Sequence, residues 1–152
     1  MNQSLFNQSH ISEILQRIDK LTPAHQRRWG KMNVTQMLAH CSVSMGTAMG
    51  INVIKRVFIG RIVGSLMKRG VLGEKPFGKN APTDKSYIFA GNEELAFEVE
   101  KAKLQRLVHE FFAGGASKCT IHPHPFFGTF TPGEWAIFQW KHLDHHLRQF
   151  GV

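Results

Sequence analysis

Three of the nine histidines in this 152-residue chain fall within five residues near its end, at His142, His145 and His146. His142 and His146 are four residues apart, and in a helix this spacing places two side chains one above the other on one face. Two imidazoles arranged in this way can bind the same divalent metal ion. The pattern therefore predicts two ligands of a metal site, and a third ligand must come from another part of the chain.

The strongest candidate for the third ligand is His40. Asn33, followed three residues later by Gln36, is typical of a capping box, so a helix is predicted from this point. Within that helix His40 shares a mostly apolar side and should point inward. Taken alone, it is better interpreted as a core histidine bonded to a backbone carbonyl. Its neighbour Cys41 could bind metal or act as a thiol, although such a cysteine is more often an inert packing residue.

The histidine pair lies in a predicted C-terminal helix. Thr131, Pro132 and Glu134 form a helix-start signature, with threonine as the cap and proline at the first helical position. The helix is expected to run to Phe150, where Gly151 ends it. Apolar residues occupy two of its sides, so it should be largely buried. Buried histidines need partners, because an unpaired buried polar group costs a few kcal/mol.

Three neutral imidazoles with an open fourth position suit a catalytic zinc site, and nickel or iron would also accept them. His145 lies one residue away from the ligand face, and Gln149 lies on it. Both are candidates for groups that orient the ligands without binding the metal. Asp144 lies farther round the helix and is expected to be solvated.

Two further histidines, His122 and His124, lie in a loop before this helix. The prolines that follow them disfavour a helix and hold the chain extended, so the two side chains are expected to project to one side. They could be additional ligands or catalytic groups, or they could simply face solvent. His124 is the stronger accessory candidate because it immediately precedes a Pro-Phe-Phe-Gly turn into the last helix.

The remaining pattern predicts an all-α fold. Helical periodicity is clear over residues 9–21, with Ser9 as the cap, and another long helix should open at Asn92 and stop at Gly114-Gly115. Four main helices, short or irregular connections and no clear strand pair favour an antiparallel four-helix bundle. We expect residues 1–152 to form a single domain of this kind.

The segment over residues 51–84 does not fit the simple bundle pattern. Its first part, residues 51–72, is apolar and basic, and it could continue the second helix or form a separate amphipathic piece. Binding to a membrane surface is conceivable. The favoured interpretation is a helix that covers the bundle and keeps its lysines and arginines in water. Residues 73–84 are rich in proline and glycine and predict an ordered surface connection.

Composition narrows the partners and the compartment. The formal net charge of +8 could indicate an anionic partner, such as nucleic acid or a phosphorylated or carboxylated small molecule. The basic residues are scattered and no nucleic-acid motif accompanies them, so nucleic-acid binding is disfavoured. Two cysteines are too few for a disulfide framework, and no apolar run reaches the ~20 residues that span a bilayer. These features, with no secretory signal, predict a cytoplasmic protein without a transmembrane segment.

The sequence resembles the DinB/YfiT-like superfamily. The resemblance rests on Asn-Val-Thr-Gln-Met-Leu-Ala-His over residues 33–40, on His-x-x-His-His-x-x-Gln over residues 142–149 and on His-Pro-Phe-Phe-Gly over residues 124–128. It covers nearly the whole chain and is closest to a branch that ends in His-x-x-His-His-Leu-Arg-Gln-Phe-Gly. The long basic segment over residues 51–84 departs from the usual pattern and weakens any inference about substrate.

The resemblance implies an up-down-down-up four-helix bundle in which His40, His142 and His146 hold a divalent metal, zinc or nickel. It implies a homodimer that activates a thiol or water against a small-molecule substrate, as a thiol S-transferase or a hydrolase. A low-molecular-weight thiol would then be a further cofactor. The alternative is a non-catalytic metal-binding module or a nucleic-acid or ligand-binding module, and a fourth protein ligand would favour a structural metal site.

Overall fold

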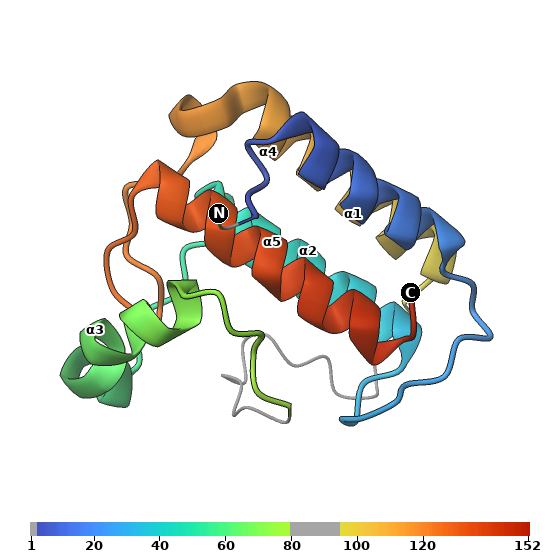
Figure 1. Ribbon diagram of the computed structural model, residues 1–152, viewed down its shortest axis with the longest axis horizontal. Coiled ribbons are helices and arrows are strands. Elements are labelled where there is room, and N and C mark those ends of the chain that lie inside the picture. The colour runs from blue at the N-terminus through green and yellow to red at the C-terminus, as the bar shows by residue number, and fades with distance from the viewer. Residues whose placement is uncertain (1–2, 80–94) are drawn as a thin grey trace.

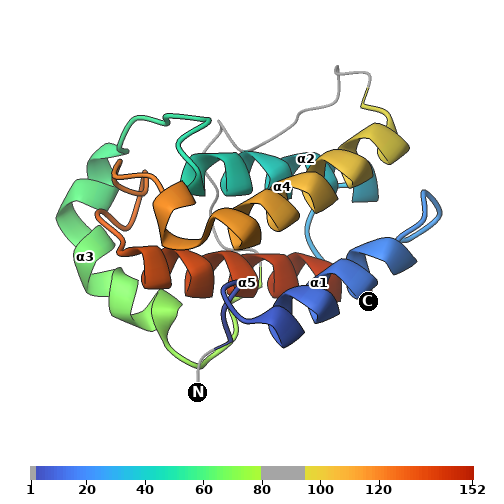
Figure 2. The same cartoon turned by 90° about the horizontal axis from the view of Figure 1, so that it is seen from above.

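The computed structural model describes residues 3–79 and 95–152, and within them the chain forms five α-helices and no named strand (Figure 1). In chain order they are α1 (Gln8–Lys20), α2 (Val34–Ala48), α3 (Phe58–Leu72), α4 (Phe97–Lys118) and α5 (Pro132–Gln149). Helices α1, α2, α4 and α5 pack against one another, whereas α3 lies at one end and contacts only α5 among the helices (Figures 1 and 2). The all-α prediction is confirmed.

The helix starts follow the capping signals with one exception. Asn33 and Thr131 each form a complete capping box, with Gln36 and Glu134 respectively, as predicted. The cap of α1 is Asn7, not Ser9, because the Asn7 side chain accepts hydrogen bonds from the backbone N–H groups of Ser9 and His10. The start expected at Asn92 lies outside the described residues.

The glycine signals at helix ends have two different outcomes. Gly151 has a φ of 84° and ends α5 as expected, because glycine readily adopts the left-handed backbone conformation that residues with a side chain rarely adopt. Gly115 has a φ of 53° and kinks α4, but helical structure resumes and continues to Lys118. The predicted stop at Gly114-Gly115 is therefore a kink and not an end.

Helix α5 is central to the packing, since it contacts each of the other four helices. It is buried on two sides, as its sequence predicts. The core around it is formed by apolar side chains from α1, α2, α4 and α5 that are almost fully inaccessible: Ile14, Ile18, Leu38, Met45, Leu104, Val108, Phe111, Trp135, Leu143 and Leu147. Burial of each such side chain is worth about 1.5–3 kcal/mol, which fixes α5 and the histidines it carries.

Helix α3 is separate from α2, which ends at Ala48. Its inner side packs against the loop before α5, and glycine is required for this approach. A Cβ atom on Gly60 would lie 2.6 Å from the carbonyl oxygen of Phe126, and one on Gly64 would overlap the same carbonyl. Arg61 and Arg69 of this helix are in water as expected, but two large apolar side chains, Phe58 and Leu66, are also each 78% exposed. None of the helices in the described segments is long and apolar enough to cross a membrane.

Candidate metal centre

Three histidines from two helices converge on one point. His40 comes from α2, and His142 and His146 come from successive turns of α5. The ligand atoms that they offer all lie within 4.8 Å of one another, and the Nε2 atoms of His40 and His142 are 3.0 Å apart. Nitrogen ligands placed tetrahedrally around zinc at 2.0–2.1 Å are separated by roughly 3.3 Å. The cluster is thus close to the size that one such ion requires.

The register between α2 and α5 is held by a buried pair of polar side chains. Ser44 Oγ donates to Gln139 Oε1 at 3.2 Å, and Gln139 Nε2 donates to the Ser44 carbonyl at 3.0 Å. Both residues lie one turn away from the histidines, on the same two helices. The reciprocal bonds prevent α2 from sliding along α5, so they keep His40 level with His142 and His146. No pattern in the sequence predicts this pair.

Gln149 determines which nitrogen of His146 carries the proton. The Gln149 Nε2 atom donates to the Trp29 carbonyl at 2.7 Å, which turns the amide oxygen toward His146. That oxygen lies 2.8 Å from His146 Nδ1, and an amide oxygen can only accept, so Nδ1 carries the hydrogen. The lone pair of His146 is therefore on Nε2. This is the arrangement in which an outer hydrogen bond orients a metal-binding imidazole.

Gly30 makes room for this amide. Its φ of 79° is unfavourable for residues with a side chain, and a Cβ atom there would lie 2.5 Å from Gln149 Nε2. The connection between α1 and α2 therefore contributes to the histidine cluster through a glycine and a backbone carbonyl.

His142 and His146 are suited to metal binding because their imidazoles are held neutral. Burial, together with the nearby imidazoles of His146 and His40, keeps the pKa of His142 well below its usual range. Burial lowers the pKa of His146 to about 3. The Nδ1 atom of His142 is buried and has no hydrogen-bond partner within the described part of the chain. Neutral imidazoles fit a bound divalent cation, since metal ligands must be deprotonated.

A family model matches residues 2–151, almost the entire chain. The chain belongs to the DUF1569 family, described as a protein of unknown function. Comparisons with curated proteins and with solved structures give no match. The chemistry of this DUF1569 chain must therefore be argued from its own residues.

His145 borders the cluster but is not one of the three grouped histidines. Its ring packs against Trp29, Phe77 and His146, with ring centroids 5.6, 6.0 and 5.0 Å away. The ring is half-buried, and burial is the main reason that its pKa is lowered. His145 and Phe77 thus form part of the wall beside the histidines in this DUF1569 chain.

His124 has a structural role in the loop before α5. It is buried among Phe127, Phe130 and other aromatic rings, and its Nδ1 atom accepts hydrogen bonds from the backbone N–H groups of Phe126 and Phe127 at 3.0 and 3.2 Å. Burial, aided by the charge of Arg56, lowers its pKa to about 3. The expectation that His122 and His124 project to one side is wrong, since His122 is exposed; the chain turns at residue 124 and does not remain extended.

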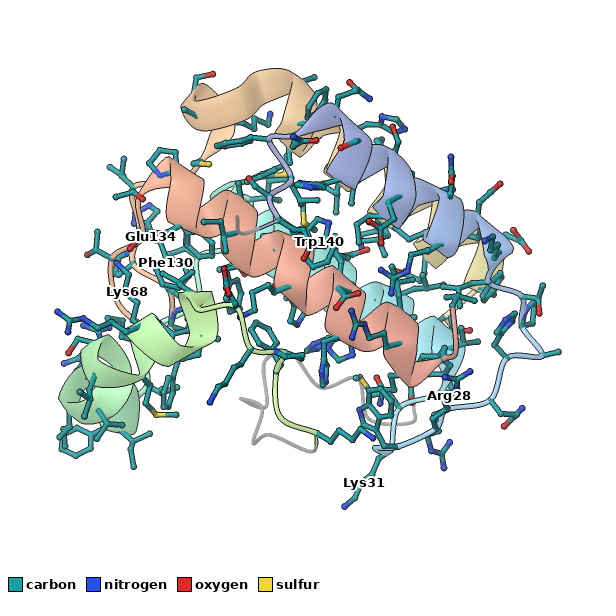
Figure 3. The ribbon with its side chains drawn as sticks, viewed as in Figure 1. Arg28, Lys31, Lys68, Phe130, Glu134 and Trp140 are labelled. Atoms are coloured by element: carbon teal, nitrogen blue, oxygen red, sulfur yellow. The ribbon has the colours of Figure 1, made fainter. Side chains whose placement is uncertain are left out.

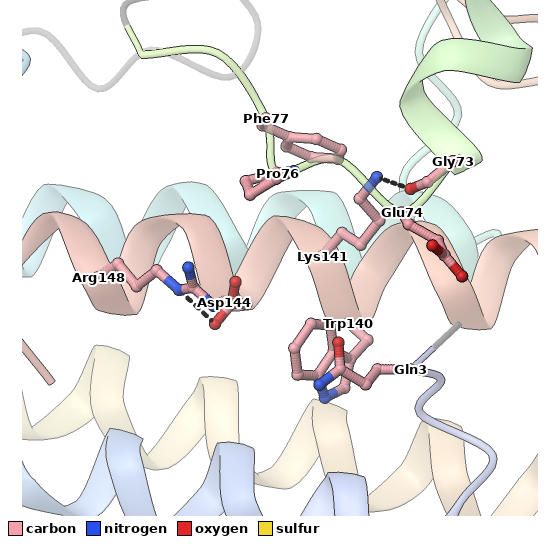
Figure 4. A pocket seen from close by; sticks show the side chains of 9 residues that line it. All are labelled: Gln3, Gly73, Glu74, Pro76, Phe77, Trp140, Lys141, Asp144 and Arg148. Atoms are coloured by element: carbon pink, nitrogen blue, oxygen red, sulfur yellow. Dashed lines mark hydrogen bonds and ion pairs between the residues drawn. The ribbon is translucent and has the colours of Figure 1, made fainter. Parts of the chain in front are cut away.

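The expectation for Asp144 is also wrong. Its carboxylate is buried and accepts from Arg17 Nη1 at 2.8 Å and from Arg148 Nε at 3.0 Å. The spacing of Asp144 and Arg148 is a recognisable helical ion pair, but the bond from Arg17 joins residues 127 positions apart. This network lies on the side of α5 that borders a pocket of about 160 Å³, shown in Figure 4, and none of the three clustered histidines lines that pocket.

Cys41 does not join the histidines. It is buried, its thiol donates to the sulfur of Met37 at 3.7 Å, and burial raises its pKa far above the usual range. A thiol held protonated in this way is a poor ligand and a poor nucleophile, so the packing interpretation of this cysteine is the one that the structure favours.

Proposed function

We propose that this chain is a divalent-metal-dependent enzyme that binds one ion, zinc or nickel, through His40, His142 and His146. The observation that carries the proposal is the convergence of three imidazole donors, from two helices, within 4.8 Å of one another. The neutral state of His142 and His146 and the proton fixed on His146 Nδ1 support it. All three features are needed for metal binding and none is needed for packing alone.

Catalysis is favoured over a structural metal site by the number of ligands. No fourth histidine, cysteine, aspartate or glutamate joins the group in residues 3–79 and 95–152. Structural zinc sites are typically closed by four protein ligands, whereas catalytic sites use three and leave one position for water or substrate. A structural metal site would require a further ligand that the described residues do not offer.

The activity that follows is the activation of a thiol or a water molecule. A divalent ion at this site would lower the pKa of a thiol or water in its open position and so supply a nucleophile near neutral pH. The protein residues would position this chemistry: Gln149 orients His146, Phe138 stacks on His142 with ring centroids 5.9 Å apart, and His145 borders the cluster. His124 is removed from the accessory group because its Nδ1 atom is already bonded within its own loop.

The reaction we propose is transfer of a low-molecular-weight thiol to a small electrophile, or hydrolysis of a small-molecule substrate. This follows the resemblance to the DinB/YfiT-like superfamily, whose bundle would comprise α1, α2, α4 and α5. The same resemblance supports a homodimer, and the low cysteine count supports a cytoplasmic location. The basic surface would attract an anionic thiol or substrate.

The test begins with metal content. Elemental analysis of the purified protein, followed by zinc and nickel titration calorimetry, should give one equivalent per chain. His142→Ala should abolish binding, whereas His122→Ala should not, because His122 is an exposed histidine from the same chain. Equal metal retention in both variants would refute the assignment. The loaded protein should then be screened for thiol transfer and for ester and amide hydrolysis against the metal-free protein.

A further inference from the structure

The outer face of α3 carries an apolar stripe that nothing in the described structure covers. Phe58, Ile62 and Leu66 recur every four residues and are 78%, 64% and 78% exposed, and Ile59 beside them is 61% exposed. Side chains with this spacing lie along one face of a helix. The opposite face carries Gly60 and Gly64, which contact the loop before α5. Contiguous exposed apolar surface of this kind marks an interaction site.

Helix α3 is held firmly from its inner side, so the stripe is a fixed feature of the surface. Lys68 Nζ bonds to Glu134 Oε2 and to the Thr129 carbonyl, each at 2.8 Å, and lies over the ring of Phe130 (Figure 3). One turn further along, at the C-terminal end of α3, Lys141 of α5 donates to the backbone carbonyl of Val71 at 2.8 Å and to that of Gly73. These contacts orient the apolar stripe away from the rest of the molecule.

The charged side chains within residues 51–73 are all of one sign. Residues 51–73 contain five lysines and arginines and no aspartate or glutamate. Arg56 and Lys68 are bonded to neighbouring parts of the protein. Lys55, Arg61 and Arg69 are exposed, and none of them forms an ion pair within the described residues. The stripe is therefore accompanied by three cationic side chains that are available to a partner.

This combination decides between the possible occupants. Two copies of the chain joined through α3 would bring six unpaired cationic side chains together, Lys55, Arg61 and Arg69 from each copy, and like charges across an interface are strongly unfavourable. An anionic lipid surface supplies both apolar chains and negative head groups, and helices that lie in this interface combine an apolar face with lysines and arginines. We propose that α3 docks the protein on anionic membranes. This proposal is independent of the metal site.

In the docked state α3 lies parallel to the bilayer surface. Phe58, Ile62 and Leu66 enter the boundary between head groups and acyl chains, to a depth of about 5–10 Å for helices of this type. The cationic groups of Lys55, Arg61 and Arg69 contact lipid phosphates and carboxylates. The protein associates reversibly and does not span the membrane.

The test is co-sedimentation of the full chain with lipid vesicles. Binding should be at least about 10-fold tighter to phosphatidylcholine vesicles containing about one third phosphatidylserine than to pure phosphatidylcholine, and it should weaken as salt is added. The double variant Phe58→Ser/Leu66→Ser should bind at least about 10-fold more weakly. Val99→Ser is the matched control, because Val99 is a 62% exposed apolar residue on α4, and it should bind like the wild type.

A charge variant gives an independent measurement. Arg61→Gln/Arg69→Gln should weaken binding about 30-fold, since each basic residue near an anionic surface contributes about 1 kcal/mol. Lys20→Gln, an exposed charge at the end of α1, should have no effect. All of these side chains are exposed, so the variants should keep the wild-type melting temperature.

Three outcomes would overturn the proposal. The first is no binding to anionic vesicles at low salt. The second is binding that the apolar and the charge variants leave unchanged. The third is a dimer in light scattering that becomes a monomer in Phe58→Ser/Leu66→Ser, which would identify the stripe as an interface between copies of the chain.

Discussion

Gln149 offers the sharpest test of how the protein orients its candidate metal ligands. In Gln149→Leu the amide that links His146 to the Trp29 carbonyl is lost, and with it two hydrogen bonds of 2.8 and 2.7 Å in a buried setting. The His146 Nδ1–H group and the Trp29 carbonyl then lose their partners. Each unsatisfied buried group costs about 1–3 kcal/mol, so the metal-free protein should be destabilised by about 2–6 kcal/mol.

The effect on the metal site should be separate from this loss of stability. Without the acceptor at Nδ1, His146 can exchange to the tautomer that carries its proton on Nε2, and the ring is no longer held in place. Loss of an outer hydrogen bond of this kind typically weakens metal binding 10- to 100-fold, or about 1.4–2.7 kcal/mol. We expect that range for zinc in Gln149→Leu.

Gln139→Leu is a matched control for this experiment. Gln139 is a fully buried glutamine on the same helix, with two hydrogen bonds to Ser44, and it contacts none of the three histidines in the bonds that the structure shows. Both variants should lower the free energy of unfolding in urea by similar amounts. Only Gln149→Leu should weaken zinc binding in chelator-competition assays at pH 7.5.

Equal zinc affinities of the two glutamine variants would refute the role of Gln149 in orienting His146. Equal and unchanged affinities would show that the His146 tautomer is not set by Gln149. Equal and reduced affinities would show that the site responds to general destabilisation of α5. In either case the orientation of His146 would need another cause.

Three further predictions concern the surroundings of the site. Gly64→Ala should lower the free energy of unfolding by about 1–3 kcal/mol, because the added methyl group overlaps the Phe126 carbonyl. Gly70→Ala has open space around the added methyl group and should raise the free energy of unfolding by about 0.5–1 kcal/mol. Equal effects of the two variants in urea denaturation would exclude the close approach of α3 to the Phe126 backbone. His124 has a native pKa of about 3, so between pH 6.5 and pH 3 the unfolded chain binds more protons than the folded one. The contribution of neutral His124 to stability is therefore complete above pH 6.5 and falls by at most about 5 kcal/mol toward pH 3. In urea denaturation at a series of pH values, His124→Asn should show a shallower loss of stability than the wild type. Burial raises the pKa of Cys119 to about 11, so iodoacetamide should label it about 100-fold more slowly than free cysteine at pH 7.5, and a rate like that of free cysteine would contradict its protected position.

The features that sequence predicts well here are those determined locally. The capping boxes at Asn33 and Thr131 depend on residues three positions apart, and both are formed as predicted. The position of His142 and His146 on one face follows from helical geometry alone. His40 required only a helix start and an apolar face. The three ligand candidates could therefore be selected from sequence, because each depends on one helix and on the existence of a common core.

The features that sequence does not reveal depend on contacts between distant segments. The position of Asp144 around its helix predicts a solvated carboxylate, but Arg17 of α1 forms an ion pair with this carboxylate and makes its burial possible. The outward stripe of α3 has the same origin: its apolar pattern is visible in the sequence, but only the fit of Gly60 against the Phe126 backbone shows which face turns inward. Amphipathic periodicity identifies a face and does not say what the face contacts.

The C-terminal His-x-x-His-His-x-x-Gln pattern can now be explained residue by residue. The first and third histidines offer nitrogen donors on successive turns of α5. The glutamine follows the third histidine by three positions, so its amide reaches that ring along the same face, and the Trp29 carbonyl decides which end of the amide does so. Gly30 is part of the same device, because any side chain there would displace the amide. A four-residue spacing on one helix thus becomes a candidate metal site only through the Trp29 carbonyl, 120 residues before Gln149, and the adjacent Gly30.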